Sequence, residues 1–351
     1  TWGMGQRSYT TASDGSVVVA RNVGGFGTLT RLGAGGERRD LDADFVGVHG
    51  HLTSVGDRVC ALRSGPTCPP EVVVIDDEPH VVAVSGVAGW AAVELPAPQA
   101  VSVAVADGRP HAQLHARRHP AAVSSKRLLC WIHGGPTDQW TVAFRPRVAY
   151  WCSRGWDVLV VDPRGTTGHG RAYQQALNGA WGRLDVDDTA TLIQHAHAEG
   201  WATPDTTVVI GGSSGGLTVL GLLADRPDLV AGGIASYPVS DLRALAEVTH
   251  RFEAHYTDTL VGPAGEPGNS RRFEELSPLH RAERIRGPLL VFHGTDDPVV
   301  PITQSDDLVE RIRDGGGDVE YVVYDGEGHG FRDPVNVSDE YERMQRFLDA
   351  I

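Results

Sequence analysis

Lysine is almost absent from this chain, and long hydrophobic runs are missing altogether. Lys126 is the single lysine, so arginine carries nearly all of the positive charge. Acidic residues outnumber basic residues by 45 to 31, which gives a net charge of −14. A nucleic-acid-binding protein normally shows the opposite balance, so we expect no nucleic-acid partner. No apolar stretch reaches the roughly 18 residues that a membrane-spanning helix needs, so we expect no membrane segment.

Cysteine is also scarce, and its four positions do not follow a metal-binding pattern. Cys60 and Cys68 flank a Gly-Pro turn, while Cys130 and Cys152 lie far apart. A disulfide between the first two is one alternative, and a reduced pair in the cytoplasm is the commoner one. We therefore expect no metal, no cofactor and a cytoplasmic protein. No signal-peptide pattern is present, and because the chain begins at Thr1 we expect a further part upstream.

The first 100 residues have the texture of an antiparallel β domain. At about 100–200 residues per domain, the 351 residues favour two domains. Short strands here are separated by Gly, Asp and Pro every few residues, which is typical of antiparallel β structure. A propeller blade needs roughly 40–45 residues, so this region has room for about two blades. The predicted strands are 16–21, 27–31, 51–54, 59–63, 71–75 and 81–85.

The pattern changes after a connecting stretch at 95–110, which contains a further strand. Short, continuously apolar runs alternate with helical patterns, and this alternation predicts a mostly parallel sheet covered on both faces. We therefore predict an α/β domain over residues 101–351, after a β domain over residues 1–100. Its strands are predicted at 128–132, 158–161, 208–210, 233–235, 289–292 and 320–324. Its helices are predicted at 171–178, 185–199, 215–224, 241–250, 304–314 and 338–349.

Residues 207–217 contain the strongest catalytic motif of the chain. They read Thr-Val-Val-Ile-Gly-Gly-Ser-Ser-Gly-Gly-Leu, an apolar strand, a glycine-rich turn and the start of a helix. This is the context of a nucleophile elbow, in which a tight turn presents a serine above the sheet. Two G-x-S-x-G patterns overlap, one centred on Ser213 and the other on Ser214. Spacing alone does not choose between the two serines.

An acid and a base follow the serine in the order that an α/β-hydrolase requires, namely Ser, then Asp or Glu, then His. The strand at 289–292 is followed by His-Gly-Thr-Asp-Asp-Pro, which offers Asp297 with Asp296 as its competitor. The strand at 320–324 is followed by a loop in which glycines bracket His329. Both positions lie at the carboxyl ends of strands, where ligands bind in open α/β sheets. The chain is thus predicted to have an α/β-hydrolase fold.

The oxyanion of an acyl-transfer reaction needs two preorganised N–H donors. One is the backbone N–H after the nucleophile, which is Ser214 if Ser213 attacks. The other is expected in His133-Gly134-Gly135-Pro136, an HGG-type loop after the strand at 128–132. We predict Gly135 as this donor, with Gly134 as the alternative, and a structural role for His133.

Five segments, in order, resemble the catalytic domain of the prolyl oligopeptidase family. They are 133–136, 161–170, 211–216, 293–301 and 328–331, within residues 126–351. The family includes acylaminoacyl peptidases, dipeptidyl peptidases and oligopeptidases. In its G-G-S-x-G-G pattern the first serine is the nucleophile, and in its H-G-x-x-D pattern the last aspartate is catalytic. The resemblance therefore implies a catalytic triad of Ser213, Asp297 and His329, with Ser214 and Gly135 forming the oxyanion hole.

The resemblance also implies a β-propeller before the catalytic domain, of which residues 1–100 are the last part; a short β domain is the rival interpretation. Two features depart from the family. An Arg or Asn usually grips a substrate carbonyl two residues after the catalytic aspartate, where this chain has Val299. No equivalent was found of the glutamate pair that binds the substrate's amino terminus in dipeptidyl peptidases, so that specificity is not expected. Residues 237–244 resemble the segment that lines the primary pocket, which implies small or hydrophobic substrate side chains.

The sequence thus favours a serine peptidase that cleaves short peptides from the amino terminus, of the aminopeptidase or acylaminoacyl-peptidase type. A carboxylesterase or amidase acting on small molecules is the alternative, and a binding module on an inactive hydrolase fold is a third. The expected partner is a short peptide or small-molecule substrate, and homo-oligomer formation stays open. The remaining candidates are a structural role for His169, His195 and His197, helix-start roles for Asp185, Asp187 and Asp188, and substrate contact for His250 and Glu253.

Overall fold

The structure, a computed structural model, describes residues 6–41, 48–66, 68–76, 78–85, 96–108, 111, 113–248, 255–266 and 268–351. Contacts among Cα atoms divide the chain into two units. The first unit consists of the residues up to Ala100 with Arg117–Ser125 and Gln139–Trp156. The second consists of Val101–Ala116, Lys126–Asp138 and Asp157–Ile351. Residues 1–100 and 101–351 remain our proposal for the domain limits.

The first unit contains two antiparallel sheets of four strands each, and in both sheets the strands follow one another in chain order. All six strands predicted in this region are present, and the two sheets resemble two propeller blades. The first sheet consists of β1 (Tyr9–Thr11), β2 (Val17–Val23), β3 (Phe26–Leu32) and β4 (Arg38–Asp40). The second consists of β5 (Val48–Val55), β6 (Arg58–Arg63), β7 (Glu71–Ile75) and β8 (Pro79–Val84).

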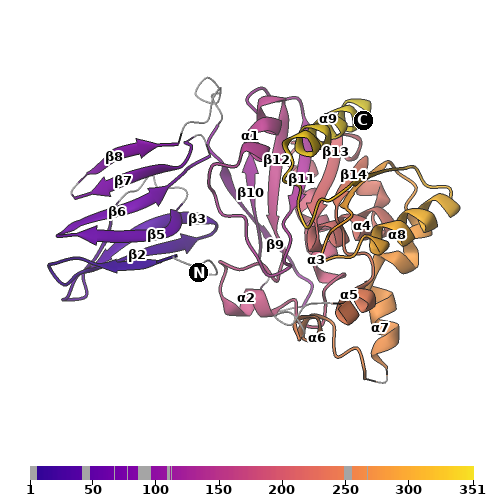
Figure 1. Cartoon of the computed structure of the whole chain (residues 1–351), viewed down its shortest axis with the longest axis horizontal. Helices are drawn as coiled ribbons and strands as arrows, with labels where there is room; N and C mark the ends of the chain where they lie inside the picture. The colour runs from indigo at the N-terminus through magenta and orange to yellow at the C-terminus, as the bar shows by residue number, and fades with distance from the viewer. Residues whose placement is uncertain are drawn as a thin grey trace. The chain divides into compact units, whose positions relative to one another are not determined.

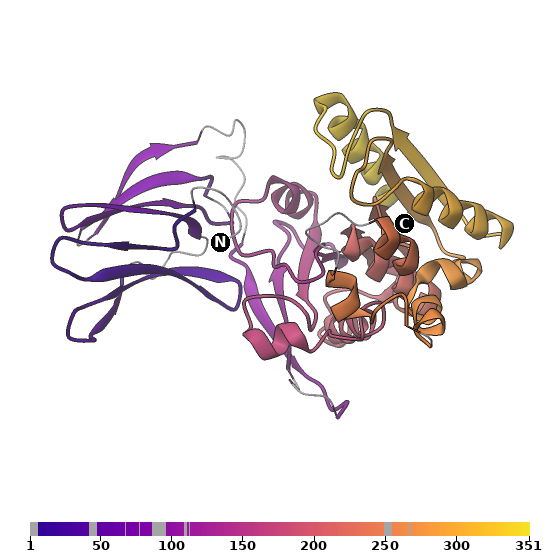
Figure 2. The same ribbon diagram turned by 60° about the horizontal axis from the view of Figure 1, so that its bottom comes forward.

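Alternation of side chains explains why these segments form half-buried strands. In β7, the side chains of Val73 and Ile75 are fully buried and that of Glu71 is buried. Val72, which lies between Glu71 and Val73, is exposed. A period of two places one set of side chains on each face of a strand. Val18 and Leu29 of the first sheet join Val73 and Ile75 of the second in one hydrophobic core, and Figure 2 shows the two sheets as layers.

The second unit is built on a sheet of eight strands in the order β16-β15-β14-β13-β11-β12-β10-β9. The run from β11 through β13, β14 and β15 to β16 is parallel. The strands are β9 (Gln99–Ala104), β10 (Gln113–His119), β11 (Arg127–Ile132), β12 (Trp156–Asp162), β13 (Thr207–Gly212), β14 (Gly232–Ser236), β15 (Leu289–Gly294) and β16 (Val319–Tyr324). The predicted strands are all present, and β10 was missed because Arg117, one of its buried side chains, breaks the apolar pattern. Its guanidinium donates to the carbonyl of Trp140 at 2.9 Å.

Helices of the second unit cover its sheet (Figure 1), with α4 against β11, β13 and β14, α8 against β16, and α9 against β15. Helix α1 (Pro146–Ser153) belongs to the first unit. The helices of the second unit are α2 (Arg171–Gln175), α3 (Leu184–Ala198), α4 (Ser214–Asp225), α5 (Leu242–Val248), α6 (Tyr256–Leu260), α7 (Asn269–Leu276), α8 (Thr303–Asp314) and α9 (Pro334–Ala350). The described residues also include the 3₁₀ segments η2 (Pro204–Thr206), η3 (Pro227–Leu229) and η4 (Pro278–Arg284). Within the described ranges, no helix is both long and apolar enough to cross a membrane.

Some helices begin or end at other residues than those predicted. The helix predicted at 338–349 begins at Pro334, because the Asp333 side chain accepts the N–H of Val335 at 2.8 Å and proline suits the first helical position. The helix predicted at 241–250 is α5, and its last two predicted positions lie outside the described residues. The short helices α1, α6 and α7 were not predicted. The α/β architecture preceded by antiparallel β structure is confirmed.

Candidate active site

Ser213 lies between β13 and α4 in a backbone conformation that side chains rarely adopt. Its φ is +56° and its ψ is −123°. A non-glycine residue keeps such a conformation only where its surroundings hold it, and these residues cluster at active sites. Here the Ser213 N–H donates to the carbonyl of Ser236 at 3.0 Å, and the Ser213 carbonyl accepts the N–H of Val239 at 3.2 Å. The end of β14 and the turn that follows it therefore hold Ser213 at the carboxyl edge of the sheet, beside the amino terminus of α4.

The glycines around Ser213 are required by close approach of the backbone. A Cβ at Gly211 would lie 2.5 Å from the carbonyl oxygen of Gly215, and one at Gly215 would lie 2.4 Å from that of Ile132. Both neighbours are backbone atoms and have no side-chain freedom with which to yield. The glycine pattern thus allows β11, β13 and α4 to meet at the elbow.

Asp297 and His329 form a hydrogen-bonded pair beside this elbow. The distance from His329 Nδ1 to Asp297 Oδ2 is 2.7 Å. The other carboxylate oxygen accepts the N–H groups of Val299 at 2.8 Å and Val300 at 2.9 Å. Because the carboxylate accepts at Nδ1, that nitrogen carries the proton and Nε2 is left able to take one. Asp296, the competing aspartate, is exposed, and its side chain accepts the neighbouring Thr295 hydroxyl at 3.1 Å.

The environment of Asp297 keeps its carboxyl group ionised. Burial by itself raises the pKa of this carboxyl, because a charge is poorly solvated there. The nearby imidazoles of His293 and His329 and the N–H of Val300 act in the opposite direction and outweigh it, so the pKa lies well below its ordinary value. The Asp297 side chain is fully buried, whereas that of His329 is 23% exposed. A fixed negative charge therefore lies behind an accessible imidazole.

The loop that carries His329 is held by a carboxylate that the sequence analysis did not single out. Glu327 is buried and accepts the N–H groups of Arg332 and Asp333, both at 2.9 Å, and the Asn336 amide at 3.0 Å. Its own carbonyl accepts the N–H of Asp296 at 2.9 Å. The loops of the acid and the base are thus joined. A glutamate among the glycines of residues 325–331 was the signal available in the sequence.

Ser213 and His329 line the same cavity, which has a volume of about 260 Å³. Gly135 and Ser214, the predicted oxyanion donors, line it as well. The rest of the lining is mostly apolar and comes from several elements: Trp181, Val239, Leu245, Tyr256, Thr257, Val299 and Val300. Val239 lies within 237–244, the segment expected to line the pocket, and Val299 is the position where the family's carbonyl-gripping residue is missing. Trp181, Leu245, Tyr256 and Thr257 were not expected here, because no local motif marks them.

The two candidate serines have different surroundings. The Ser214 hydroxyl is buried and accepts the indole N–H of Trp181 at 3.1 Å. Ser213 is partly exposed beside the cavity. Gly134 also lies close, since a Cβ there would be 3.6 Å from the Cβ of Ser213. His133 is buried, with its Nε2 2.8 Å from the Thr166 hydroxyl, so its side chain braces this loop.

The other histidines and aspartates considered from the sequence have separate partners. His169 Nε2 lies 2.7 Å from Asp162, His197 Nε2 lies 2.9 Å from the Thr207 hydroxyl, and His195 packs edge-on against Trp201. Asp185 and Asp187 lie in the first turn of α3, and Asp188 pairs with Arg164. In the described part of the chain, no group of three or more His, Cys, Asp or Glu side chains is arranged to hold a metal. His250 and Glu253 lie outside the described residues.

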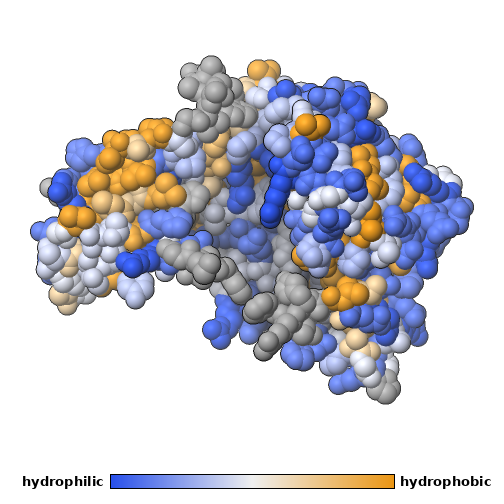
Figure 3. Space-filling view, in the orientation of Figure 1, coloured by the Kyte–Doolittle hydropathy of each residue, from blue (hydrophilic) through white to orange (hydrophobic). Residues whose placement is uncertain are grey.

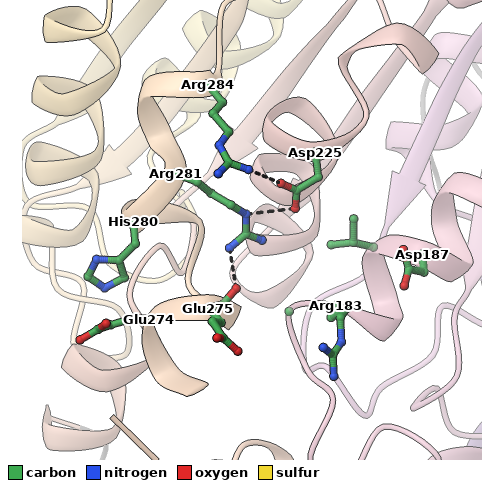
Figure 4. A pocket seen from close by; sticks show the side chains of 10 residues that line it. Arg183, Asp187, Asp225, Glu274, Glu275, His280, Arg281 and Arg284 are labelled. Atoms are coloured by element: carbon green, nitrogen blue, oxygen red, sulfur yellow. Dashed lines mark hydrogen bonds and ion pairs between the residues drawn. The ribbon is translucent and has the colours of Figure 1, made fainter. Parts of the chain in front are cut away.

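A larger cavity of about 430 Å³ lies elsewhere in the same unit, between α3, α7 and η4. Figure 4 shows Arg281 and Arg284 directed toward Asp225, at 3.0 and 3.8 Å. Its described lining carries no serine, threonine or cysteine. Size alone therefore does not identify the catalytic cavity.

Asp185 is a buried carboxyl group whose pKa shift makes the stability of the fold depend on pH. It accepts the N–H of Gly182 at 2.7 Å and the Thr218 hydroxyl at 2.6 Å. Burial raises its pKa to about 6, above the ordinary value, although these hydrogen bonds oppose the shift. Because the folded state holds this proton more tightly, its contribution to stability is present below about pH 4 and is lost as pH rises through about 6.

We therefore expect Asp185→Asn to raise the thermal midpoint at pH 8 and to change it little at pH 4. A shift of about two pKa units corresponds to roughly 3 kcal/mol at most. Thermal melting at the two pH values measures this. Asp187→Asn is the matched control, because Asp187 is half-exposed and pairs with Arg226. Equal destabilisation of Asp185→Asn at both pH values would contradict the prediction.

The fold and this geometry define a protein of the α/β-hydrolase class. Residues 142–351, more than half of the chain, match the model of the prolyl oligopeptidase family, and the chain belongs to that family. The resemblance and the fold class predicted from the motifs are thereby confirmed.

Individual relatives agree with this assignment. The chain is 34% identical over 212 residues to dipeptidyl aminopeptidase BIII of Pseudoxanthomonas mexicana, covering 60% of this chain and 31% of that protein. It is 30% identical over 207 residues to the acylamino-acid-releasing enzyme of Arabidopsis thaliana, covering 58% and 27%. The solved structure of a puromycin-hydrolyzing peptidase from Mycobacterium tuberculosis matches with a TM-score of 0.88 and 30% identity, covering 99% of this chain and 55% of that one. The chain thus spans about a third of these curated relatives and about half of the solved structure.

Proposed function

We propose that this chain is the catalytic part of a serine peptidase that removes residues from the amino terminus of short peptides, as an aminopeptidase or acylaminoacyl peptidase. The observation that carries the proposal is the 2.7 Å bond from His329 to the buried Asp297, on a cavity that Ser213 also lines. An ionised acid, an imidazole oriented by it and a serine at a nucleophile elbow are the parts that acyl transfer requires.

In the proposed reaction, Ser213 Oγ attacks the carbonyl carbon of the scissile bond while its proton passes to His329 Nε2. The resulting oxyanion is stabilised by the N–H groups of Gly135 and Ser214. The imidazolium then gives its proton to the leaving amine, and an acyl-enzyme remains on Ser213. Water repeats the sequence and releases the acyl group. Asp297 stays ionised and keeps the imidazole in the required tautomer.

The lining of the cavity supports an apolar side chain on the residue whose carbonyl is attacked. Trp181, Leu245, Tyr256 and Val299 contribute apolar surface, and the described lining contains no carboxylate or guanidinium group. A charged side chain there would lose its hydration without gaining a partner.

We expect kcat/KM for the nitroanilides of leucine and phenylalanine to exceed that for lysine and glutamate by about 100-fold. Parallel assays with free and N-acetylated aminoacyl nitroanilides separate an aminopeptidase from an acylaminoacyl peptidase. Puromycin is a further substrate to include, because one relative is named for hydrolysing it. Equal rates on leucine and glutamate substrates would contradict the proposed role of the cavity.

A carboxylesterase or amidase acting on small molecules is the second candidate. Val299 favours it, because its side chain offers no donor to grip a peptide carbonyl. Rates on nitrophenyl esters, measured beside those on the aminoacyl nitroanilides, distinguish the two functions. Turnover of esters without detectable cleavage of any aminoacyl amide or peptide would replace the peptidase proposal by this one.

A cytoplasmic location and association into homo-oligomers belong to the same proposal. All four cysteines, each within the described residues, are free thiols, which supports a reducing compartment.

Val81, Val82 and Val84 of β8 are 48%, 64% and 60% exposed and belong to an apolar patch visible in Figure 3. Such patches often mark association surfaces. Sedimentation of the chain and of its Val82→Glu variant measures this association.

A further inference from the structure

Tyr237 has a strained backbone directly after β14. Its φ is +40°, in the region that L side chains rarely occupy. Its N–H donates to the carbonyl of Phe292 at 2.6 Å, which ties the turn to β15. The residues on either side of this turn, Ser236 and Val239, are those that bond the backbone of Ser213. Such strained residues persist only where their surroundings hold them, and they cluster at active sites. The contacts of the Tyr237 side chain are therefore of interest.

The ring of Tyr237 packs against the imidazole of His329. Their ring centroids are 4.5 Å apart and their planes are tilted by 55°. Tyr237 also meets Phe331 edge-on, at 5.7 Å and 80°. Phe331 packs in turn on Tyr324 at 4.9 Å, so the ring of Tyr237 belongs to a larger aromatic cluster.

The same ring lies beside the nucleophile elbow. A Cβ added to Gly212 would come within 3.0 Å of Tyr237 Cε2, which leaves no room for a side chain there. The ring of Tyr237 therefore lies between the loop of Ser213 and the loop of His329. The strained backbone is what allows one residue to follow β14 and still reach this position.

We propose that Tyr237 is a positioning residue for His329, and this inference rests on the proposed function. The Asp297 bond at Nδ1 fixes one end of the imidazole and leaves it free to tilt about that end. The ring of Tyr237 blocks this movement on one side. Its aromatic face also attracts the positive charge that the imidazole acquires when it takes the proton of Ser213. The charged group facing His329 from the neighbouring loop is Asp297, with His293 3.6 Å behind the carboxylate.

Two substitutions separate the ring from simple bulk. Tyr237→Phe keeps the aromatic face and removes only the hydroxyl, whereas Tyr237→Leu keeps much of the volume without an aromatic face. We expect the phenylalanine variant to retain kcat within about twofold and the leucine variant to lose about tenfold in kcat, with KM changed less than about twofold. Loss in kcat alone is expected because the ring acts on the proton transfer and does not line the substrate cavity.

Steady-state kinetics on the best aminoacyl nitroanilide, or on a nitrophenyl ester if only esters are turned over, tests this inference in the whole chain. Thermal melting of each variant shows whether it is folded, and the rates are compared among folded variants. Three results would each overturn the role of the ring: an equal kcat for the leucine variant and the wild type, an equal loss of kcat in both variants, or an increase in KM with kcat unchanged. Activity that survives in Ser213→Ala would instead overturn the proposed function, so the two failures are distinguishable.

Discussion

Ser213→Ala is expected to lower kcat/KM by at least about 10⁴-fold and to abolish labelling by a fluorophosphonate. Without the hydroxyl no acyl-enzyme forms, and only the oxyanion donors and the binding cavity remain to assist attack by water. The fold should survive, because the substitution removes one oxygen from a partly exposed side chain and leaves the backbone bonds to Ser236 and Val239 in place. Labelling followed by gel fluorescence and the nitroanilide assay measure the two effects.

Ser214→Ala is the matched control, one residue further along the chain. Its hydroxyl is an acceptor for Trp181, and the backbone N–H that we assign to the oxyanion hole is unchanged by the substitution. Losing that acceptor leaves a buried indole N–H without its partner, so we expect a loss of about 1–3 kcal/mol in stability. Fluorophosphonate labelling should persist. Labelling that is lost only in Ser214→Ala would transfer the nucleophile to that residue.

The choice between these two serines illustrates what a motif predicts by itself. Gly211 and Gly215 flank Ser213, and Gly212 and Gly216 flank Ser214, so both patterns are complete. Each of these glycines has a separate reason in the fold, because an added Cβ would come close to Gly215, Ile132, Tyr237 and Pro238 respectively. The family pattern supplied the preference for Ser213. The structure adds a physical difference between the two serines, since the Ser214 hydroxyl accepts a hydrogen bond from the indole N–H of Trp181. That bond joins residues 33 positions apart and has no local signature.

The fold was predictable where burial is one-sided or complete along an element. The strands of the parallel sheet are continuous apolar runs, and β13 to β16 were found close to their actual limits. Strand β10 was not, because Arg117 is buried there through a hydrogen bond to a distant carbonyl. Short helices such as α6 and α7 owe their stability to packing and not to their own pattern.

The supporting residues of the site were the least predictable part. Glu327 and Tyr237 stand near predicted residues in the sequence, yet their importance depends on what they contact. Glu327 collects three donors from beyond His329. The ring of Tyr237 packs against the imidazole of His329, which lies 92 positions further along the chain. Side chains that act through tertiary contacts are marked by no period or spacing.

Asp297→Asn is expected to lower kcat by about 10⁴-fold while the fold persists. In the wild type, one carboxylate oxygen accepts the N–H groups of Val299 and Val300, and the other accepts His329 Nδ1. An asparagine must turn its carbonyl oxygen toward the two backbone donors, because its NH₂ group would repel them. Its NH₂ group then faces Nδ1 and donates to it. The imidazole is left with its proton on Nε2, where it has no lone pair to take the proton of Ser213.

Asp296 provides the matched control for the Asp297→Asn variant. Asp296→Asn changes an exposed side chain and should leave kcat within about twofold, as substitutions away from the chemistry usually do. Asp297→Asn should also lose fluorophosphonate labelling rate in proportion to kcat, since both depend on proton removal from Ser213. Steady-state assays and labelling time courses of the two variants, with thermal melting to verify folding, provide the comparison. Because the two aspartates are adjacent and share one loop, a 10⁴-fold loss in Asp296→Asn with an active Asp297→Asn would assign the acid to Asp296.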